Sequence, residues 1–150
     1  MMASPVSAQS AYVFPMGEAF DESIPSPEEF LGYPIGSFVT RQDRIVAYMQ
    51  ELARLSDRAT YQSIGLTFEH RDMPVLAVTS PSNHGRLEEI RQAHLASLTT
   101  DGGQADGLPA IAHLAYGVHG NEASSGEAAM LSAYWLVAGL GPEVERYLAQ

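Results

Sequence analysis

The stretch that most constrains how this chain can fold covers residues 108–139, LPAIAHLAYGVHGNEASSGEAAMLSAYWLVAG. Residues 109–118 form a continuous apolar run, which predicts a strand that is covered on both faces. From Ser124 onward the chain has almost no polar face, which predicts a buried helix with Ser124 or Ser125 as its N-cap. A strand and a helix of this kind each need further layers of structure to cover them. The chain is therefore expected to be α/β, with a mixed β-sheet and flanking helices.

The residues upstream support this class because their periodicity changes along the chain. A helix is expected over residues 41–56, with Thr40 as its N-cap. Its apolar stripe at helical spacing consists of Ile45, Tyr48, Met49, Leu52 and Leu55. Residues 60–68 and 73–80 then have the composition of two strands, which are expected to form a hairpin around a polar turn.

Further helices are expected on both sides of the constraining stretch. One runs through residues 87–98, with Ser82 or Asn83 as its cap, and a short last helix begins at Pro142. Residues 99–107, which connect the helix over 87–98 to the apolar run, are rich in Gly and Asp, as in a surface loop.

Residues 1–39 are expected to form an irregular arm, because closely spaced prolines interrupt helices and remove backbone donors. Their aromatic side chains indicate that the arm lies across a folded body. One helical turn is expected at residues 27–30, capped by Ser26 with Pro27 in the first position. The predicted organisation is therefore an arm over residues 1–39 and an α/β domain over residues 40–150.

Composition excludes several functions. The formal net charge is -10, with 18 acidic and 8 basic residues, and the few arginines are scattered. A nucleic-acid surface needs clustered Lys and Arg, so no nucleic-acid partner is expected. No apolar run is long enough to cross a bilayer, so no membrane insertion is expected. There is no cysteine, which excludes disulfides and thiolate chemistry.

Localisation stays open. The first ten residues have neither a basic nor an apolar region, so the sequence contains no complete signal peptide. Ala8 and Gln9 suit the small-residue end of a cleavage site. This favours a secreted or periplasmic protein whose signal sequence starts further upstream.

The polar loop at 119–122 holds the chemistry, His-Gly-Asn-Glu. Catalytic zinc uses three protein ligands from His, Glu and Asp and leaves one position for water. His119 and Glu122 can reach one ion because a turn brings residues i and i+3 together, and Gly120 permits a tight backbone path. The motif alone is weak, since a glutamate before a helix also serves as a dipole or capping partner.

Two longer stretches resemble a known family. Residues 116–139, YGVHGNEASSGEAAMLSAYWLVAG, are similar to the first zinc-ligand segment of the zinc carboxypeptidase family, the carboxypeptidase A-like metallopeptidases. Residues 30–90 resemble the family's opening helix, hairpin and following turn, with a G-x-T-x-E-x-R-like run from Gly65 to Arg71. The resemblance covers residues 28–150 and implies the N-terminal half of a zinc-carboxypeptidase-like fold.

The resemblance also implies a function and residue roles. It identifies a hydrolase that cleaves peptide bonds of peptide or protein substrates with metal-activated water. His119 and Glu122 would be the first two ligands of one Zn2+ ion. Asn121 occupies the place where digestive members carry a substrate-contacting arginine, so it is a weak candidate for substrate binding.

The remaining parts of the family's site lie further downstream than this chain reaches. They are a third histidine ligand, the arginine and asparagine residues that hold the substrate carboxylate, and a glutamate general base. The other histidines, His70, His84, His94 and His113, are poor substitutes. His113 and His119, for example, lie about 20 Å apart in extended geometry. The chain is therefore expected to be an incomplete catalytic domain, with no catalytic residue of its own and no activity alone.

Two other functions compete with this one. The first is a non-catalytic binding domain that retains the fold without the full zinc site. The second is a serine hydrolase with Ser124 or Ser125 as nucleophile, but no G-x-S-x-G motif surrounds either residue. Both serines are better explained as helix caps.

Overall fold

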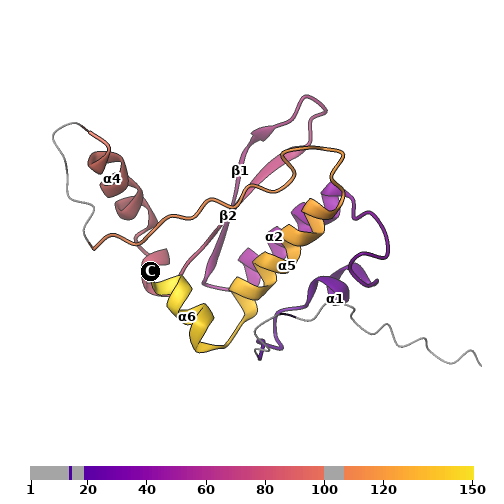
Figure 1. Cartoon of the computed structure of the whole chain (residues 1–150), viewed down its shortest axis with the longest axis horizontal. Helices are drawn as coiled ribbons and strands as arrows, with labels where there is room; N and C mark the ends of the chain where they lie inside the picture. The colour runs from indigo at the N-terminus through magenta and orange to yellow at the C-terminus, as the bar shows by residue number, and fades with distance from the viewer. Residues whose placement is uncertain (1–13, 15–18, 100–106) are drawn as a thin grey trace, which may run out of the picture.

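The computed structural model describes residue 14 and residues 19–99 and 107–150, shown in Figure 1. In chain order the elements are α1 (Pro27–Leu31), α2 (Gln42–Leu55), β1 (Ala59–Leu66), β2 (Asp72–Val78), α3 (Pro81–His84), α4 (Leu87–Ser97), α5 (Ser124–Ala138) and α6 (Pro142–Ala149). Helices together with an antiparallel pair of strands confirm the predicted α/β class.

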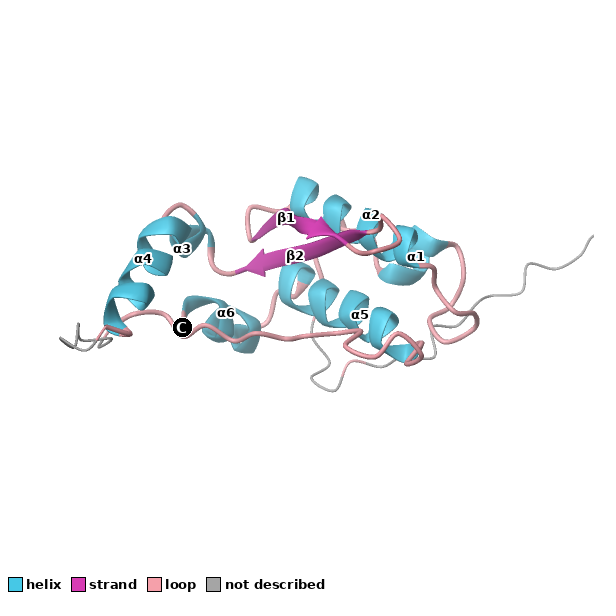
Figure 2. Ribbon diagram, turned by 90° about the horizontal axis from the view of Figure 1, so that it is seen from above, coloured by secondary structure: helices cyan, strands magenta, loops and turns pink. Residues whose placement is uncertain are grey.

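The core is built around two helices, α2 and α5, which lie side by side with the hairpin packed against them (Figures 1 and 2). Tyr48 and Leu52 of α2 and Met130 of α5 are fully buried between them. The predicted stripe on α2 faces this core, because its members Ile45 and Leu55 also pack there. Each large apolar side chain buried in this way stabilises the fold by about 1.5–3 kcal/mol.

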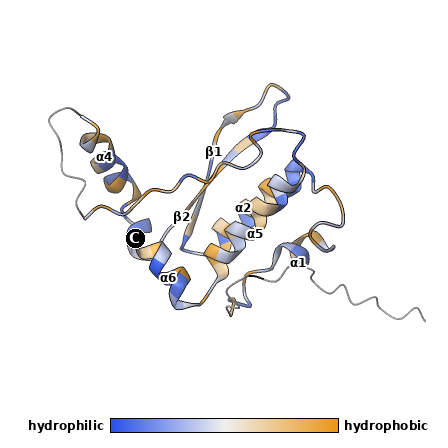
Figure 3. Cartoon of the chain, in the orientation of Figure 1, coloured by the Kyte–Doolittle hydropathy of each residue, from blue (hydrophilic) through white to orange (hydrophobic). Residues whose placement is uncertain are grey.

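Hydropathy distinguishes the helices. Figure 3 shows α5 in mostly pale and orange colours, whereas α4 and α6 carry clearly hydrophilic residues as well. This agrees with the burial of six α5 residues, against only Ile90 in α4. No helix in the described part of the chain is long and apolar enough to span a membrane.

The described residues of the N-terminal region pack against this core. Ser26 and Glu29 form a reciprocal capping box that starts α1 with Pro27 at its first position, as predicted. The Phe20 ring stacks on Tyr134 with centroids 4.8 Å apart, and Phe30 contacts Tyr48 at 5.1 Å. These aromatic contacts tie the segment to both α5 and α2.

The predicted hairpin is confirmed. Strands β1 and β2 pair antiparallel from Ala59↔Val78 to Leu66↔Asp72, with a bulge between Ser63 and Leu66. The connecting turn closes with a hydrogen bond from the Thr67 N–H to the Arg71 carbonyl at 2.8 Å.

Residues 109–118, predicted to be a buried strand, are not one. The run is extended and largely exposed, and it passes α6 on its way to the start of α5 (Figure 2). Its described backbone makes one hydrogen bond to another backbone group, from the Ala110 N–H to the Gln150 carbonyl at 2.5 Å. An apolar run indicates that a segment favours burial. A strand, however, also requires a neighbouring strand that exchanges backbone hydrogen bonds with it. The described sheet consists of β1 and β2 and offers the run no such neighbour.

Two predicted helix caps are also wrong. Arg41, not Thr40, is the N-cap of α2, because the Thr40 hydroxyl bonds to a residue of α5 instead. Ser80 caps the separate short helix α3, and α4 starts after Arg86 without a side-chain cap. A local pattern cannot show that a capping hydroxyl has a better partner far along the chain.

Candidate metal-binding turn

The residues with metal-binding chemistry lie in the turn that leads from the extended run into α5. The Glu122 N–H donates to the His119 carbonyl at 3.1 Å, so the two residues stand at opposite ends of one tight turn. The Ser125 N–H then donates to the Glu122 carbonyl at 3.1 Å and connects the turn to the helix. The predicted turn is therefore present, and the side chains of His119 and Glu122 are both exposed to solvent.

The glycine that shapes this region is not the one expected. Gly120 does not adopt a positive φ, and an added Cβ there would meet nothing within 4 Å. Gly117 has φ +73° and makes the left-handed bend that directs the chain from the extended run into the turn.

Ser124 and Ser125 are not caps, contrary to the sequence prediction. They are the first two residues of α5, and its N-cap Ala123 has helical backbone angles and no side-chain hydrogen bond. Because Ala123 already has helical backbone angles, α5 begins without the extended residue that a side-chain cap requires. The positive end of the helix therefore lies next to Glu122, where it attracts a negative charge.

The same region holds a second acidic residue, Glu127, which the sequence does not mark as functional. Glu127, in the first turn of α5, is only 7% exposed. Its carboxylate accepts hydrogen bonds from the Thr40 hydroxyl at 2.7 Å and from the Gly36 N–H at 2.9 Å. A glutamate in the first turn of a helix has no sequence signal that separates this role from simple dipole pairing.

The other histidines lie away from the turn or make other contacts. His70 is in the hairpin turn with φ 59°, and His84 contacts Thr60. His94 bonds to the Pro109 carbonyl through Nε2 at 2.7 Å. His113 is exposed on the extended run.

The donor set fits zinc in kind but not in number. An imidazole and a carboxylate are both ligands that zinc accepts. However, no cluster of three or more His, Cys, Asp or Glu side chains that could hold a metal ion occurs among the residues described here. Asn121 lies in the same turn, and its side chain is exposed.

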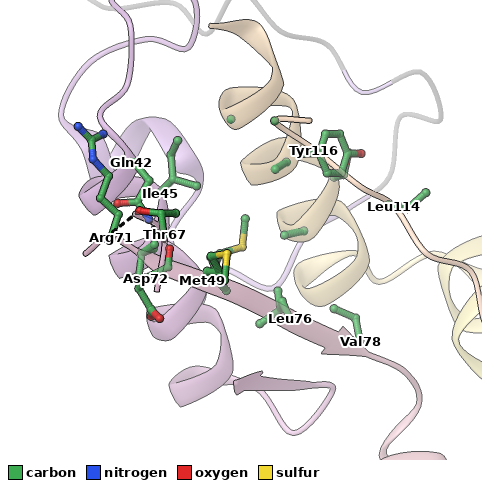
Figure 4. Close-up of a pocket in the computed structure, with 18 of the residues that line it drawn as sticks. Gln42, Ile45, Met49, Thr67, Arg71, Asp72, Leu76, Val78, Leu114 and Tyr116 are labelled. Carbon is green, nitrogen blue, oxygen red and sulfur yellow. Dashed lines mark hydrogen bonds between the residues drawn. The ribbon is translucent and has the colours of Figure 1, made fainter. Parts of the chain in front are cut away.

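A groove of about 560 Å³ begins beside the turn, at Gly117. It runs between β2 on one side and the extended run on the other, over α2 and α5 (Figure 4). Apolar side chains such as Met49, Leu76 and Leu114 line most of it, and its polar end holds Gln42, Arg71 and Asp72.

At this polar end Asp72 is held in the charged form. Hydrogen bonds from the Ser63 and Tyr61 hydroxyls, that from Ser63 having the larger effect, lower the pKa of the Asp72 carboxyl below its ordinary value of 3.8. Partial burial, and then the bond to Asp72, raise the pKa of Tyr61. Asp72 therefore links the two strands near the hairpin turn through its side chain.

Comparison with known proteins gives one match. Residues 45–150 match the family model of the zinc carboxypeptidases, well over half of the chain. The match includes most of α2 and all of the hairpin, the turn and α5. The observed helices and strands are consistent with part of a carboxypeptidase-like fold. No curated protein and no solved structure matches the chain significantly. The chain belongs to the zinc carboxypeptidase family.

Proposed function

We propose that this chain is the N-terminal part of a zinc-dependent metallocarboxypeptidase-like catalytic domain, and that His119 and Glu122 are two of its zinc ligands. One observation carries the proposal: in a chain of this family, the two residues stand at the ends of one hydrogen-bonded turn at the head of α5, with both side chains exposed. The substrate class is a peptide or protein.

The residues of this chain have distinct tasks in that function. His119 and Glu122 hold the ion, and the positive end of α5 favours the charged carboxylate there. When bound, zinc lowers the pKa of a water molecule toward about 7 and polarises the substrate carbonyl. Asn121, exposed between the two ligands, contacts the substrate.

We propose further that the domain, residues 40–150 here with the arm 1–39 before it, needs more protein to become active. Two observations support this. The described residues provide no third metal ligand beside the turn. The described sheet also has a free edge at β2, which faces the unpaired extended run across the apolar groove. An apolar groove between an open strand edge and an unpaired extended segment is what a sheet lacking a strand leaves exposed.

The alternative is a non-catalytic binding domain that keeps the fold. The absence of a third donor among the described residues favours it. This alternative differs from the first proposal in its requirements: a binding domain needs neither zinc nor a general base in any longer form of the protein.

Zinc titration calorimetry tests the first proposal. The 150-residue chain is expected to bind zinc weakly. His119→Ala or Glu122→Ala is expected to weaken binding at least about tenfold, because loss of a residue that only supports a ligand already costs roughly 10- to 100-fold. His113→Ala, an exposed histidine on the neighbouring run, is the matched control and is expected to bind as the wild type does. Equal affinity in all four proteins would exclude the turn as a zinc site.

A peptidase assay separates the two candidates. A longer polypeptide that continues beyond Gln150 is expected to bind zinc stoichiometrically and to hydrolyse peptides, and the 150-residue chain is expected to do neither. Turnover by the short chain contradicts the need for further residues. A longer form without zinc or activity supports the binding domain.

A further inference from the structure

Glu127 is a buried carboxylate that the proposed zinc site does not use. It lies five residues after Glu122, in the first turn of α5, with 7% of its surface exposed. None of the ion pairs among the described residues includes it. A buried charge without a counter-ion is costly unless hydrogen bonds replace its water.

Both carboxylate oxygens of Glu127 are bonded to one short segment, residues 33–40. Oε1 accepts from the Thr40 hydroxyl at 2.7 Å and Oε2 from the Gly36 N–H at 2.9 Å. The Tyr33 hydroxyl bonds to the same Thr40 oxygen at 3.0 Å. Thr40 itself is 6% exposed, so the network is shielded from water. Hydrogen bonds to an ionised acceptor in such a place are short and directional.

This network holds the first turn of α5 from one side, and α2 holds it from another. A Cβ added to Gly126 would lie 2.4 Å from the Ile45 Cδ1, so the two helices are already in close approach there. The same turn of α5 is joined to the metal-binding turn by the bond from the Ser125 N–H to the Glu122 carbonyl. A buried carboxylate contributes little net stability compared with an apolar residue of its size. Its hydrogen bonds are directional, however, and so restrict the orientation of the helical turn that carries it.

We propose that Glu127 is a positioning residue: by binding residues 33–40 it fixes the first turn of α5, and with it the orientation of the His119–Glu122 turn. The fixing of the turn follows from contacts within this chain. Its consequence for zinc affinity rests on the proposed function.

Backbone dynamics measured by 15N relaxation on the whole chain test the positioning directly. In Glu127→Gln, the amide oxygen can still accept from the Gly36 N–H, but the amide NH2 then faces the Thr40 oxygen, so the charge-assisted bond from Thr40 is replaced by a weaker neutral one. Order parameters of residues 119–125 are expected to fall from the rigid range of about 0.85 to below about 0.6. Those of α2 are expected to stay unchanged.

Matched variants keep the test decisive. Thr40→Val removes one donor and keeps the carboxylate, so it is expected to loosen residues 119–125 in the same way. Thr40→Ser retains the hydroxyl and is expected to behave as the wild type. Glu145→Gln in α6 breaks the ion pair with Arg58, which also donates to the Gly139 carbonyl at the C-terminal end of α5. This variant is the control and is expected to leave the turn rigid. If Glu127→Gln fails to fold, the two Thr40 variants give the answer.

Zinc affinity is the second measurement. Glu127→Gln is expected to weaken zinc binding at least about threefold, a change of about half of the 1.4 kcal/mol that corresponds to tenfold. A turn that stays rigid in Glu127→Gln and Thr40→Val, or that loosens equally in Glu145→Gln, overturns the proposal. If the wild type binds no zinc while the turn loosens as expected, the proposed function fails and the positioning role stands.

Discussion

Thr40 and Glu127 are 87 residues apart in sequence and 2.7 Å apart in space. The sequence suggests a local role for each, an N-cap for Thr40 and a dipole partner for Glu127. The fold instead gives the two residues a shared role. Thr40 has only one hydroxyl proton to donate, and it donates that hydrogen bond to the buried Glu127 carboxylate. Such a pairing has no periodicity, so no sequence pattern reveals it.

The Thr40 hydroxyl is expected to contribute measurably to stability. Thr40→Val leaves the buried Glu127 carboxylate without one of its donors, which costs about 1–3 kcal/mol of unfolding free energy. Thr40→Ser keeps the donor and loses only a methyl group, so a smaller loss is expected. Urea denaturation of the three proteins measures the difference. Equal losses for Val and Ser would show that packing, not the hydrogen bond, is what Thr40 contributes.

His119 and Glu122 illustrate the opposite case. Their spacing of three residues is local, and the backbone hydrogen bond between them is the one that a turn of this length predicts. The partner that would complete a metal site is not local, and no pattern within four residues can supply it.

At the scale of elements, periodicity predicted α2 from its apolar stripe and the hairpin from its alternation, while α5 was predicted from its almost wholly apolar composition. It failed for residues 109–118, where hydrophobicity is high but no partner strand is present among the described residues. Composition reports how strongly a segment favours burial, while pairing depends on the rest of the fold.

The hairpin is expected to weaken in acid through Asp72. Its folded-state pKa lies below the ordinary 3.8, so the stabilisation it provides is complete above that value and is lost as the pH falls through the lower folded-state pKa. Denaturation of the wild type and Asp72→Asn between pH 6 and pH 2 measures this. The stability difference is expected to be largest near pH 6 and to vanish at the acid end. A difference independent of pH contradicts a role for the charge.

The contact between α2 and α5 makes a second prediction at this scale. Gly126→Ala gains up to about 1 kcal/mol of helix propensity but overpacks against Ile45, which costs about 1–3 kcal/mol. Ile45→Val removes the Cδ1 atom that an added Cβ would meet. Gly126→Ala is therefore expected to cost less in the Ile45→Val background than in the wild type. A double-mutant cycle by urea denaturation checks this, and additive effects would place the two side chains out of contact.

At the scale of the whole molecule, the chain combines a well-packed helical core with an apolar surface that its described residues leave open. Ile111, Leu114 and Val118 are each more than half exposed along the extended run. Apolar groups arranged in this way on a folded protein mark a surface that another segment covers.

The 150-residue chain is accordingly expected to bind the dye 1-anilinonaphthalene-8-sulfonate and enhance its fluorescence. Leu114→Ser, in the lining of the groove, is expected to reduce the enhancement. Leu98→Ser changes an exposed leucine at the C-cap of α4, outside the groove, and is expected to leave the enhancement unchanged. A wild type that does not enhance dye fluorescence would show that the apolar run is covered in solution.

The central claim, that His119 and Glu122 provide part of a zinc site, is tested most directly by zinc K-edge X-ray absorption of the zinc-loaded chain. The wild type is expected to show one imidazole ligand with a Zn–N distance of about 2.0–2.1 Å, together with oxygen ligands. His119→Ala is expected to lose the imidazole signal, and His113→Ala to retain it. An imidazole signal that persists in His119→Ala would contradict the claim, because the histidine that binds zinc would then lie elsewhere.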